Sequence, residues 1–459
     1  MAGKAAEKAL QKYVLRVLYV ETGESGPNET ESLQTNRWKD GGPHAIRNMS
    51  FIRTGICVLA AFAVLAHGAV EPWSEGVLEM GAAVLLLGWS WRAFTESELK
   101  LIWNPLLWPL LGFWLVAAVQ LATGKTAVPF LTRIELLKYS ALVALFFLCV
   151  QSYRTRAHWR NFVWFLLSLG FAVSLFGILQ HFTFNGKLYW VRELQYGGIP
   201  FGPYVNRNHF AGLMELLIPP GLAISILGAE RRDQLPLVTL FTLLPIGALF
   251  LSASRGGIIS LLVEVGFLAI LIVARRREKK VLVTATLIVM LAALMVSWLG
   301  IGRALDRFAT YKKLETSEGR RVEMLHDSLH IFQDHRVLGT GLGTLQEVFP
   351  RYETLYDGLV VNHSHNDYAE ALAETGVIGG FCGLLFLVLL FWMSWKILSV
   401  EGDVRSFAYH AAALVACLGL LVHAGVDFNF HIPSNALIFL LQSALATSVF
   451  PSLPLSRGG

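Results

Sequence analysis

Residues 361–380 read VNHSHNDYAEALAETGVIGG, and this stretch changes character along its length. It opens with polar residues that include two histidines, and it becomes apolar after Glu374. The apolar run continues to about Ile397, which is long enough to cross a membrane as a helix. A histidine, an amide and a helix start therefore lie where the chain enters the bilayer. We take this edge as the candidate active site.

The same stretch carries a signal for a helix start. Ser364 stands three residues before Asp367, a spacing typical of a helix N-cap. With Ser364 as the cap, His365 and Asn366 lie in the first turn, where backbone N–H groups without partners favour a bound anion. His365 is the candidate general base, because imidazole titrates near neutral pH. A structural histidine held by hydrogen bonds is the alternative.

Composition predicts an all-α polytopic membrane protein. Of the 459 residues 54% are hydrophobic and 15% are charged, whereas about a quarter of the residues of a soluble protein are charged. The four cysteines all fall in apolar runs without a shared motif spacing, so neither a disulfide framework nor a metal site is expected from them. The net charge of +5 does not indicate nucleic acid, because membrane topology explains most of the basic residues.

About twelve membrane spans are predicted from apolar runs of about 20 residues. They cover residues 51–70, 76–94, 101–122, 134–152, 160–182, 209–229, 235–253, 256–274, 281–299, 371–397, 406–427 and 431–450. With the N-terminus in the cytoplasm, Lys and Arg concentrate in the cytoplasmic connections, as the positive-inside rule requires. This agreement with the positive-inside rule supports both the number of spans and their orientation.

The spans divide the chain into five parts. Residues 1–50 form a cytoplasmic extension, and residues 51–299 hold the first nine spans. A long outside loop at 300–366 precedes the last three spans at 367–450 and a cytoplasmic tail at 451–459. The extension is either a basic amphipathic helix on the membrane surface or dispensable, with Met49 as the start. No signal peptide is expected in it.

The long outside loop is predicted to contain an amphipathic helix. Residues 322–332 have helical periodicity, and Met324, Leu325, Leu329 and Phe332 make the apolar face. Glycines then alternate in GTGLGT, residues 339–344, and mark a turn. No strand precedes them, so they do not indicate a dinucleotide site.

Three arginines on the outer side are the informative charges. Arg255 lies in SASRGG, in the very short connection between the seventh and eighth spans, and Arg320 and Arg321 open the loop helix. Arginine at a membrane edge is costly, and its planar guanidinium matches phosphate oxygens. The alternatives are an interfacial anchor for Arg255 and a solvated helix face for the other two.

Other polar residues near the outer side have either a chemical or a structural role, and the sequence does not decide between the two. Asp367, Glu370 and Glu374 share one face of the tenth span, as rival bases or as partners of arginine. Asn208, with Asn206 and His209, either holds sugar hydroxyls or caps the sixth span.

Two more groups stand near the outer face. Asp427 and His431 belong either to the site or to helix packing. Metal binding by His363, His365 and Asp367, or by His326 and His330, lacks a recognised zinc spacing, so no metal site is predicted.

With these residues the chain resembles a known family. His365-Asn366, nine residues and then GVIG at 376–379 are similar to the HN-x9-GxxG pattern of the O-antigen ligase and O-antigen polymerase superfamily. The layout of about twelve spans with a long loop before the motif resembles it too, as do Asn208 in NRNHFAG, Arg255, Arg321 and the GTGLGT turn. The resemblance covers residues 51–450. Leu325 departs from the Trp that the family often has four residues after the loop arginine, which leaves Arg320 and Arg321 open.

The resemblance implies a glycosyltransferase of the bacterial inner membrane, with its active site facing the periplasm. The donor would be a glycan on undecaprenyl pyrophosphate, and the partners would include membrane lipid. His365 would deprotonate the acceptor hydroxyl, while Arg255 and Arg321 would bind the pyrophosphate and stabilise the leaving group. The further candidates for substrate binding are Arg320, Asn208, Asn366 and Asp367. Members are similar in needing neither nucleotide sugar nor metal, so no cofactor is expected.

Three readings of function follow. The first is a ligase that moves a glycan onto lipid A core or a similar acceptor. The second is a polymerase of the same superfamily, and a protein O-glycosylating member is a variant of the same chemistry. The third is a polysaccharide transporter without catalysis, which would want charged groups near the middle of the bilayer. Charged residues within the spans are few, with Lys138 and Glu264 as the main candidates, which argues against a transporter. The enzyme is favoured mostly on the resemblance.

Overall fold

The computed structural model describes residues 49–95, 101–194, 199–275, 283, 290, 315–356, 358 and 360–449. The predicted N-terminal extension, nearly all of the ninth span, the start of the long loop and the C-terminal tail lie outside the described residues. Within the described ranges all regular elements are helices, beside two isolated β-bridges, Leu188 with Arg192 and Phe201 with Tyr204.

In the part of the chain that the structure describes, eight helices are long and apolar enough to cross a membrane. They are α5 (Pro72–Thr95), α7 (Pro129–Ser152), α8 (Arg156–Phe182), α9 (Arg207–Leu227), α10 (Leu235–Ser252), α11 (Arg255–Arg275), α15 (Asp367–Val400) and α16 (Val404–His423). Three shorter apolar helices are α4 (Ser50–Leu65), α6 (Leu107–Ala122) and α17 (Pro433–Ala446). The all-helical multi-pass membrane class is confirmed, and the number of twelve spans stays a prediction.

The predicted boundaries are wrong where they matter most for the site. The eleventh span was expected to reach residue 427, but α16 ends at His423 in a turn that contains Gly425. The last helix begins at Pro433, because proline suits the first helical position, where its missing N–H costs nothing. Asp427 and His431 therefore lie on the connection between two helices and are not part of either.

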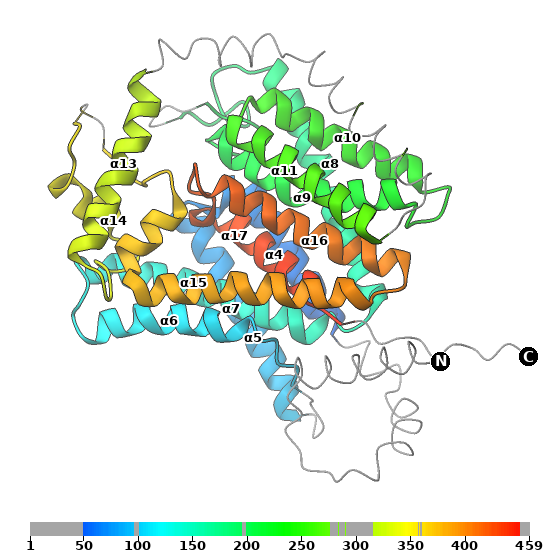
Figure 1. The fold of residues 1–459 in the computed structure, drawn as a ribbon, viewed down its shortest axis with the longest axis horizontal. Coiled ribbons are helices and arrows are strands. Elements are labelled where there is room, and N and C mark those ends of the chain that lie inside the picture. Colours follow the sequence, from blue (N-terminus) through cyan, green and yellow to red (C-terminus); the bar gives the residue numbers. More distant parts are fainter. Residues whose placement is uncertain are drawn as a thin grey trace, which may run out of the picture.

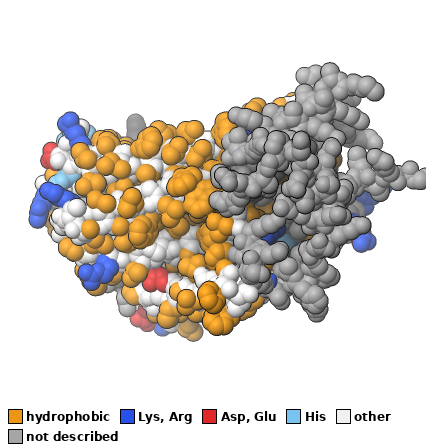
Figure 2. Space-filling model, turned by 90° about the horizontal axis from the view of Figure 1, so that it is seen from below, with side chains coloured by type: hydrophobic (Ala, Val, Ile, Leu, Met, Phe, Trp, Pro, Cys, Tyr) orange, Lys and Arg blue, Asp and Glu red, His pale blue; other side chains and the backbone are white. Residues whose placement is uncertain are grey.

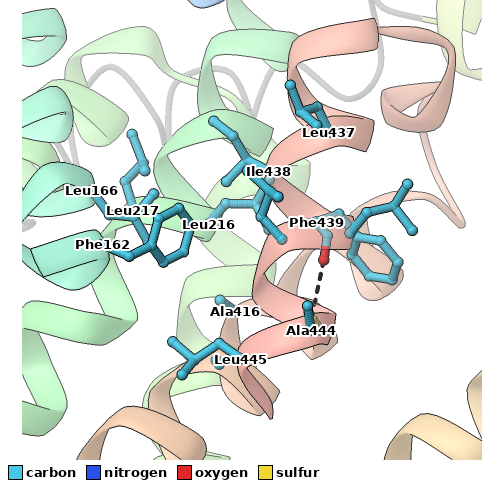
Figure 3. Close-up of a cluster of buried hydrophobic side chains, with 14 of the residues drawn as sticks. Phe162, Leu166, Leu216, Leu217, Ala416, Leu437, Ile438, Phe439, Ala444 and Leu445 are labelled. Carbon is cyan, nitrogen blue, oxygen red and sulfur yellow. Dashed lines mark hydrogen bonds between the residues drawn. The ribbon is translucent and has the colours of Figure 1, made fainter. Parts of the chain in front are cut away.

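The core of the bundle is built around α9, α16 and α17, whose residues are mostly buried. Figure 3 shows apolar side chains of these helices meeting those of α8: Phe162, Leu166, Leu216, Leu217, Ala416, Leu437, Ile438, Phe439, Ala444 and Leu445. The peripheral helices instead leave large apolar side chains exposed, such as Phe94 and Leu87 on α5. Hydrophobic side chains cover much of the described surface in Figure 2. This pattern suits a bundle surrounded by lipid.

A separate small unit, the outer cap, covers one end of the bundle (Figure 1). It comprises residues 315–361, with α13 (Glu315–Asp334), α14 (Leu345–Val348) and the short helix η3 (Phe349–Arg351). Its own apolar cluster is formed by Met324, Ile331, Leu345, Val348, Phe349, Val361 and, from α15, Ala373.

The predicted helix of the loop is confirmed, but its predicted apolar face is only partly right. Met324 is buried, whereas Leu325, Leu329 and Phe332 are only half-buried. The buried face instead runs through Asp327 and Ser328 to Ile331. Asp327 accepts hydrogen bonds from the backbone N–H and the hydroxyl of Thr354, so a polar residue belongs to the inner face of this helix.

The outer cap is anchored at Gly376, where α15 is broken. This residue has φ 64° and ψ −164°, a conformation essentially restricted to glycine. A Cβ here would lie 2.4 Å from the carbonyl carbon of Val337, and the next N–H, of Val377, donates to the carbonyl of Arg336 over 2.7 Å. Before the break, the carboxylate of Glu374 accepts the N–H groups of Gly343 and Leu345. The lack of a side chain at Gly376 therefore lets the backbone of the outer cap pack against α15.

Candidate active site

His365 lies just before α15 in a backbone conformation that non-glycine residues rarely adopt, with φ +52°. Its side chain is 25% exposed, and its Nδ1 lies 3.2 Å from Oδ1 of Asp427. A carboxylate that accepts the Nδ1–H fixes the tautomer with its lone pair on Nε2. The pair thus provides a partly exposed base held by a buried acid.

Asp427 is the acceptor on which the site converges. It is fully buried, and its Oδ2 accepts from the side-chain amide of Asn208 over 2.6 Å. Its Oδ1 accepts the backbone N–H of Phe428 over 2.9 Å and lies 3.8 Å from Nε2 of His209. Burial alone raises the pKa of Asp427, but the hydrogen bond from His365 and the neighbouring histidines outweigh it, so its pKa lies well below the usual range.

Arg321, from the outer cap, reaches the same carboxylate. Its Nη1 donates to the carbonyl of Val426 over 3.2 Å, and its Nη2 lies 3.8 Å from Oδ2 of Asp427. The side chain is 40% exposed, so a bound anion has access to it. Arg320 points elsewhere: it is buried and pairs with Glu353 at 3.4 Å. Of the two arginines that the sequence left open, the structure brings Arg321 to Asp427, the partner of His365.

Arg255 is the first residue of α11 and is half-buried. A Cβ on its neighbour Gly256 would lie 2.5 Å from Nε2 of His423 and 3.2 Å from Cγ2 of Val426. The first turn of α11 therefore lies against the turn that leads to Asp427. This places Arg255 at the border of the site, on a different helix from Arg321.

The predicted N-cap of α15 is wrong. Asn366, not Ser364, caps the helix, and its Oδ1 accepts the N–H groups of Tyr368 and Ala369 at 3.1 and 2.9 Å. The N–H of Asp367 donates to the carbonyl of Ala424. Because these first-turn donors are taken, this helix start does not offer the anion site expected from the sequence. The amide nitrogen of Asn366 also donates, to Gly425, so this residue supports the site by holding its backbone.

The three acids of α15 turn away from His365 and are not rival bases. Asp367 accepts from Nδ1 of His431 at 2.9 Å and from the N–H of Phe430 at 3.1 Å. Glu370 accepts from Nδ1 of His363 at 2.7 Å and lies 3.3 Å from Nε2 of His431. Asp367 thus joins the start of α15 to the 424–431 connection, which is a positioning role.

Two groups of side chains bring possible metal ligands within 4.8 Å of one another: His363, Glu370 and His431, and His326, Asp327 and His330. In the first group, hydrogen bonds and ion pairs within the group and to Asp367 account for the observed geometry. We therefore assign it to structure. The set His363, His365 and Asp367 considered from the sequence is not brought together as a ligand set among the described residues.

Residues 240–384 match the protein family described as O-Antigen ligase. This match supports the O-antigen ligase and O-antigen polymerase superfamily. The matched O-antigen ligase region includes Arg255, Arg321 and His365, whereas Asn208 and Asp427 lie outside it. The comparison with curated proteins found no match.

Within this O-antigen ligase-like site, Asp427 is the residue that sequence analysis undervalued. It was named as either functional or structural, and nothing in its neighbourhood decides between the two. The deciding signal is spatial: Asn208 is 219 positions earlier in the chain and His365 is 62 positions earlier. No local pattern brings these residues to one carboxylate.

A pH dependence of stability follows from His431. Burial lowers its pKa, but the charge of Glu370 and the hydrogen bond to Asp367 outweigh this and raise the pKa to about 10. Since the folded pKa exceeds the unfolded value of about 6.5, the stabilisation is complete below that pH and is lost as pH rises towards 10. His431→Gln should therefore lower the melting temperature more at pH 6 than at pH 10. Melting curves in detergent at both pH values test this, and an equal decrease at both would contradict it.

Proposed function

We propose that the chain is an O-antigen ligase-like glycosyltransferase at the periplasmic face of the bacterial inner membrane. It moves a glycan from undecaprenyl pyrophosphate to an acceptor hydroxyl, on lipid A core or a similar glycan. The observation that carries the proposal is the partly exposed His365, hydrogen-bonded to the buried Asp427, with Arg321 close to the same carboxylate. The family match supports an enzyme of this general type.

In the proposed reaction, Nε2 of His365 takes the proton of the acceptor hydroxyl as its oxygen attacks the anomeric carbon of the donor. The bond from that carbon to the pyrophosphate breaks, and undecaprenyl pyrophosphate leaves. Asp427 orients the imidazole and stabilises the imidazolium that forms, as a buried carboxylate does in other histidine-dependent enzymes. The reaction as proposed uses neither a metal ion nor a nucleotide.

The leaving group gains negative charge as the bond breaks, so fixed positive charge accelerates the reaction. Arg321 and Arg255 provide that charge from two sides, one from the outer cap and one from the start of α11. Asn208 holds Asp427 from α9. Five segments thus contribute to one site: α9, α11, α13, the residues just before α15 and the connection that carries Asp427. A bound donor would contact the bundle and the outer cap together.

A reconstituted assay tests the function. Purified protein in liposomes is mixed with an undecaprenyl-pyrophosphate glycan, with and without lipid A core, with no nucleotide or metal and with a chelator in a parallel sample. Glycan on the core and release of undecaprenyl pyrophosphate would establish the ligase. Longer lipid-linked chains without core would establish the polymerase, which shares the chemistry. No release with either acceptor would contradict both.

The arginines are expected to act through their planar guanidinium as well as their charge. Arg321→Lys and Arg255→Lys should each lower kcat/KM by about 10- to 100-fold, because a lysine cannot bind two phosphate oxygens at once. Arg336→Lys is the matched control, since Arg336 is exposed on the outer cap and donates to the carbonyl of Gln333. It should retain activity within about twofold, as surface substitutions usually do. Wild-type turnover in both site variants would leave these arginines as simple anchors.

A further inference from the structure

Behind the site, Glu215 of α9 and His423 of α16 form a buried pair that the proposed reaction does not use. Nδ1 of His423 lies 2.7 Å from Oε1 of Glu215, and both side chains are almost completely shielded from solvent. The sequence gives no sign that these two residues pair, because 208 positions separate them.

His423 begins the turn that contains Asp427. It is the last residue of α16, and its carbonyl accepts the N–H of Val426 over 2.9 Å and that of Asp427 over 3.0 Å. Arg321 donates to the carbonyl of Val426 within the same turn. The position of the His423 backbone therefore sets where the carboxylate of Asp427 meets His365.

The other side of the pair faces the first turn of α11. A Cβ on Gly256 would lie 2.5 Å from Nε2 of His423, and one on Gly257 would lie 3.3 Å from Oε1 of Glu215 and 2.6 Å from Cβ of Ala211. The two glycines that follow Arg255 thus let α11 close on the pair. Glu215 and His423 lie at the junction of the helices that carry Asn208, Arg255 and the turn of Asp427.

Stability alone is a poor reason for such a pair. Removing two charged groups from water costs about as much as their attraction returns, and apolar residues of similar volume are often as stable. A buried hydrogen-bonded pair does, however, fix the relative position of the elements that carry it, because each misplaced partner would be left without its hydrogen bond.

We propose that Glu215 and His423 are positioning residues, which hold the turn of Asp427 against α9 and the first turn of α11. The inference rests on the proposed function and adds two residues to it. The charged and titratable groups around the pair are Asp427, Arg321, His209 on α9 and Glu264 on α11, and Arg255 precedes the two glycines of α11 that lie against the pair.

Two substitutions of Glu215 separate the effect of its hydrogen bond from the effect of its side-chain size. Glu215→Leu removes the acceptor and should lower kcat by about 100-fold, since a misplacement of about 1 Å can cost this much, while KM for the donor changes little. Glu215→Gln keeps an oxygen for Nδ1 of His423 and should retain activity within about fivefold, because the partner is not left unsatisfied. If Glu215→Gln lost as much activity as Glu215→Leu, the proposal would be overturned.

Glu264→Leu is the matched control. Glu264 is equally buried in the same junction, where a Cβ on Gly419 of α16 would lie 1.8 Å from its Oε1. Among the described residues no hydrogen-bond partner is found for either of its oxygens. Its kcat should stay within about threefold of wild type, since among the described residues no hydrogen bond joins its carboxylate to Glu215, His423 or the turn of Asp427. A decrease equal to that of Glu215→Leu would show that the junction is merely structural.

A double variant shows whether the pair acts through Asp427. Glu215→Leu combined with Asp427→Asn should be no slower than Asp427→Asn alone, because positioning a lost carboxylate has no further value. Multiplied losses would overturn the proposal even if every variant folds. In the same assay, equal rates for wild type and His365→Ala would refute the proposed function itself, and the inference would fall with it.

Discussion

His365→Ala is expected to abolish glycan transfer, with a loss of at least about 10²- to 10⁴-fold, the usual contribution of a general base. The reason is that Nε2 of His365 is the proton acceptor that the hydrogen bond from Nδ1 to Asp427 prepares. The variant should still insert into the membrane and fold, because the side chain is partly exposed and the cap of α15 is provided by Asn366. The rate of undecaprenyl pyrophosphate release in liposomes measures the effect.

His326→Ala provides the control for that experiment. His326 is a histidine of the outer cap, its side chain is 59% exposed, and it contacts His330 and Asp327 but no residue of the site. It should turn over within about twofold of wild type, as expected for a surface substitution. If His365→Ala kept the wild-type rate with a normal melting temperature, the assignment of the base would be wrong.

Asp427→Asn is expected to reduce kcat by about 10³- to 10⁴-fold, similar to the loss of the buried acid in other histidine dyads. An asparagine at this position loses the charge that stabilises the imidazolium of His365, and it can present an N–H where the imidazole needs an acceptor. Asn208 and Arg321 lose the same carboxylate. KM for the donor should change less than kcat, because the acid contacts the base and not the glycan.

The matched control for Asp427→Asn is Asp334→Asn. Asp334 is an exposed acid of α13 that accepts a hydrogen bond from the hydroxyl of Tyr352. Both variants remove one negative charge from the outer side, but one lies in the site and the other does not. Comparable activity in the two variants would refute the role of Asp427.

Much of the fold follows from local sequence, and the site follows only in part. Apolar runs predict helices because each must satisfy its own backbone in the bilayer, whatever surrounds it. The helix ends were harder: Ser364 and Asn366 both suit a cap, and the contact of Asn366 with Gly425 on a distant turn helps to select between them. The apolar face of α13 was misplaced because Asp327 is buried by its bonds to Thr354.

The site residues divide in the same way. His365 and Arg255 stand in recognisable local motifs, so the sequence points to them. Arg320 and Arg321 are adjacent, and only the packing of α13 decides that one meets Glu353 and the other Asp427. Glu215 and His423 lie within predicted spans, and no local pattern reveals that they pair, because the pairing depends on a junction of three helices.

The break of α15 at Gly376 has a consequence for building hybrid enzymes. Glu374 accepts N–H groups of the GTGLGT turn and its surroundings, so the segment just before the break packs with the outer cap, whereas the remainder of the helix packs with the bundle. A chimaera that exchanges outer caps between relatives should therefore be joined at Gly376. A junction at the helix start would separate Glu374 from Gly343 and Leu345, whose N–H groups it accepts.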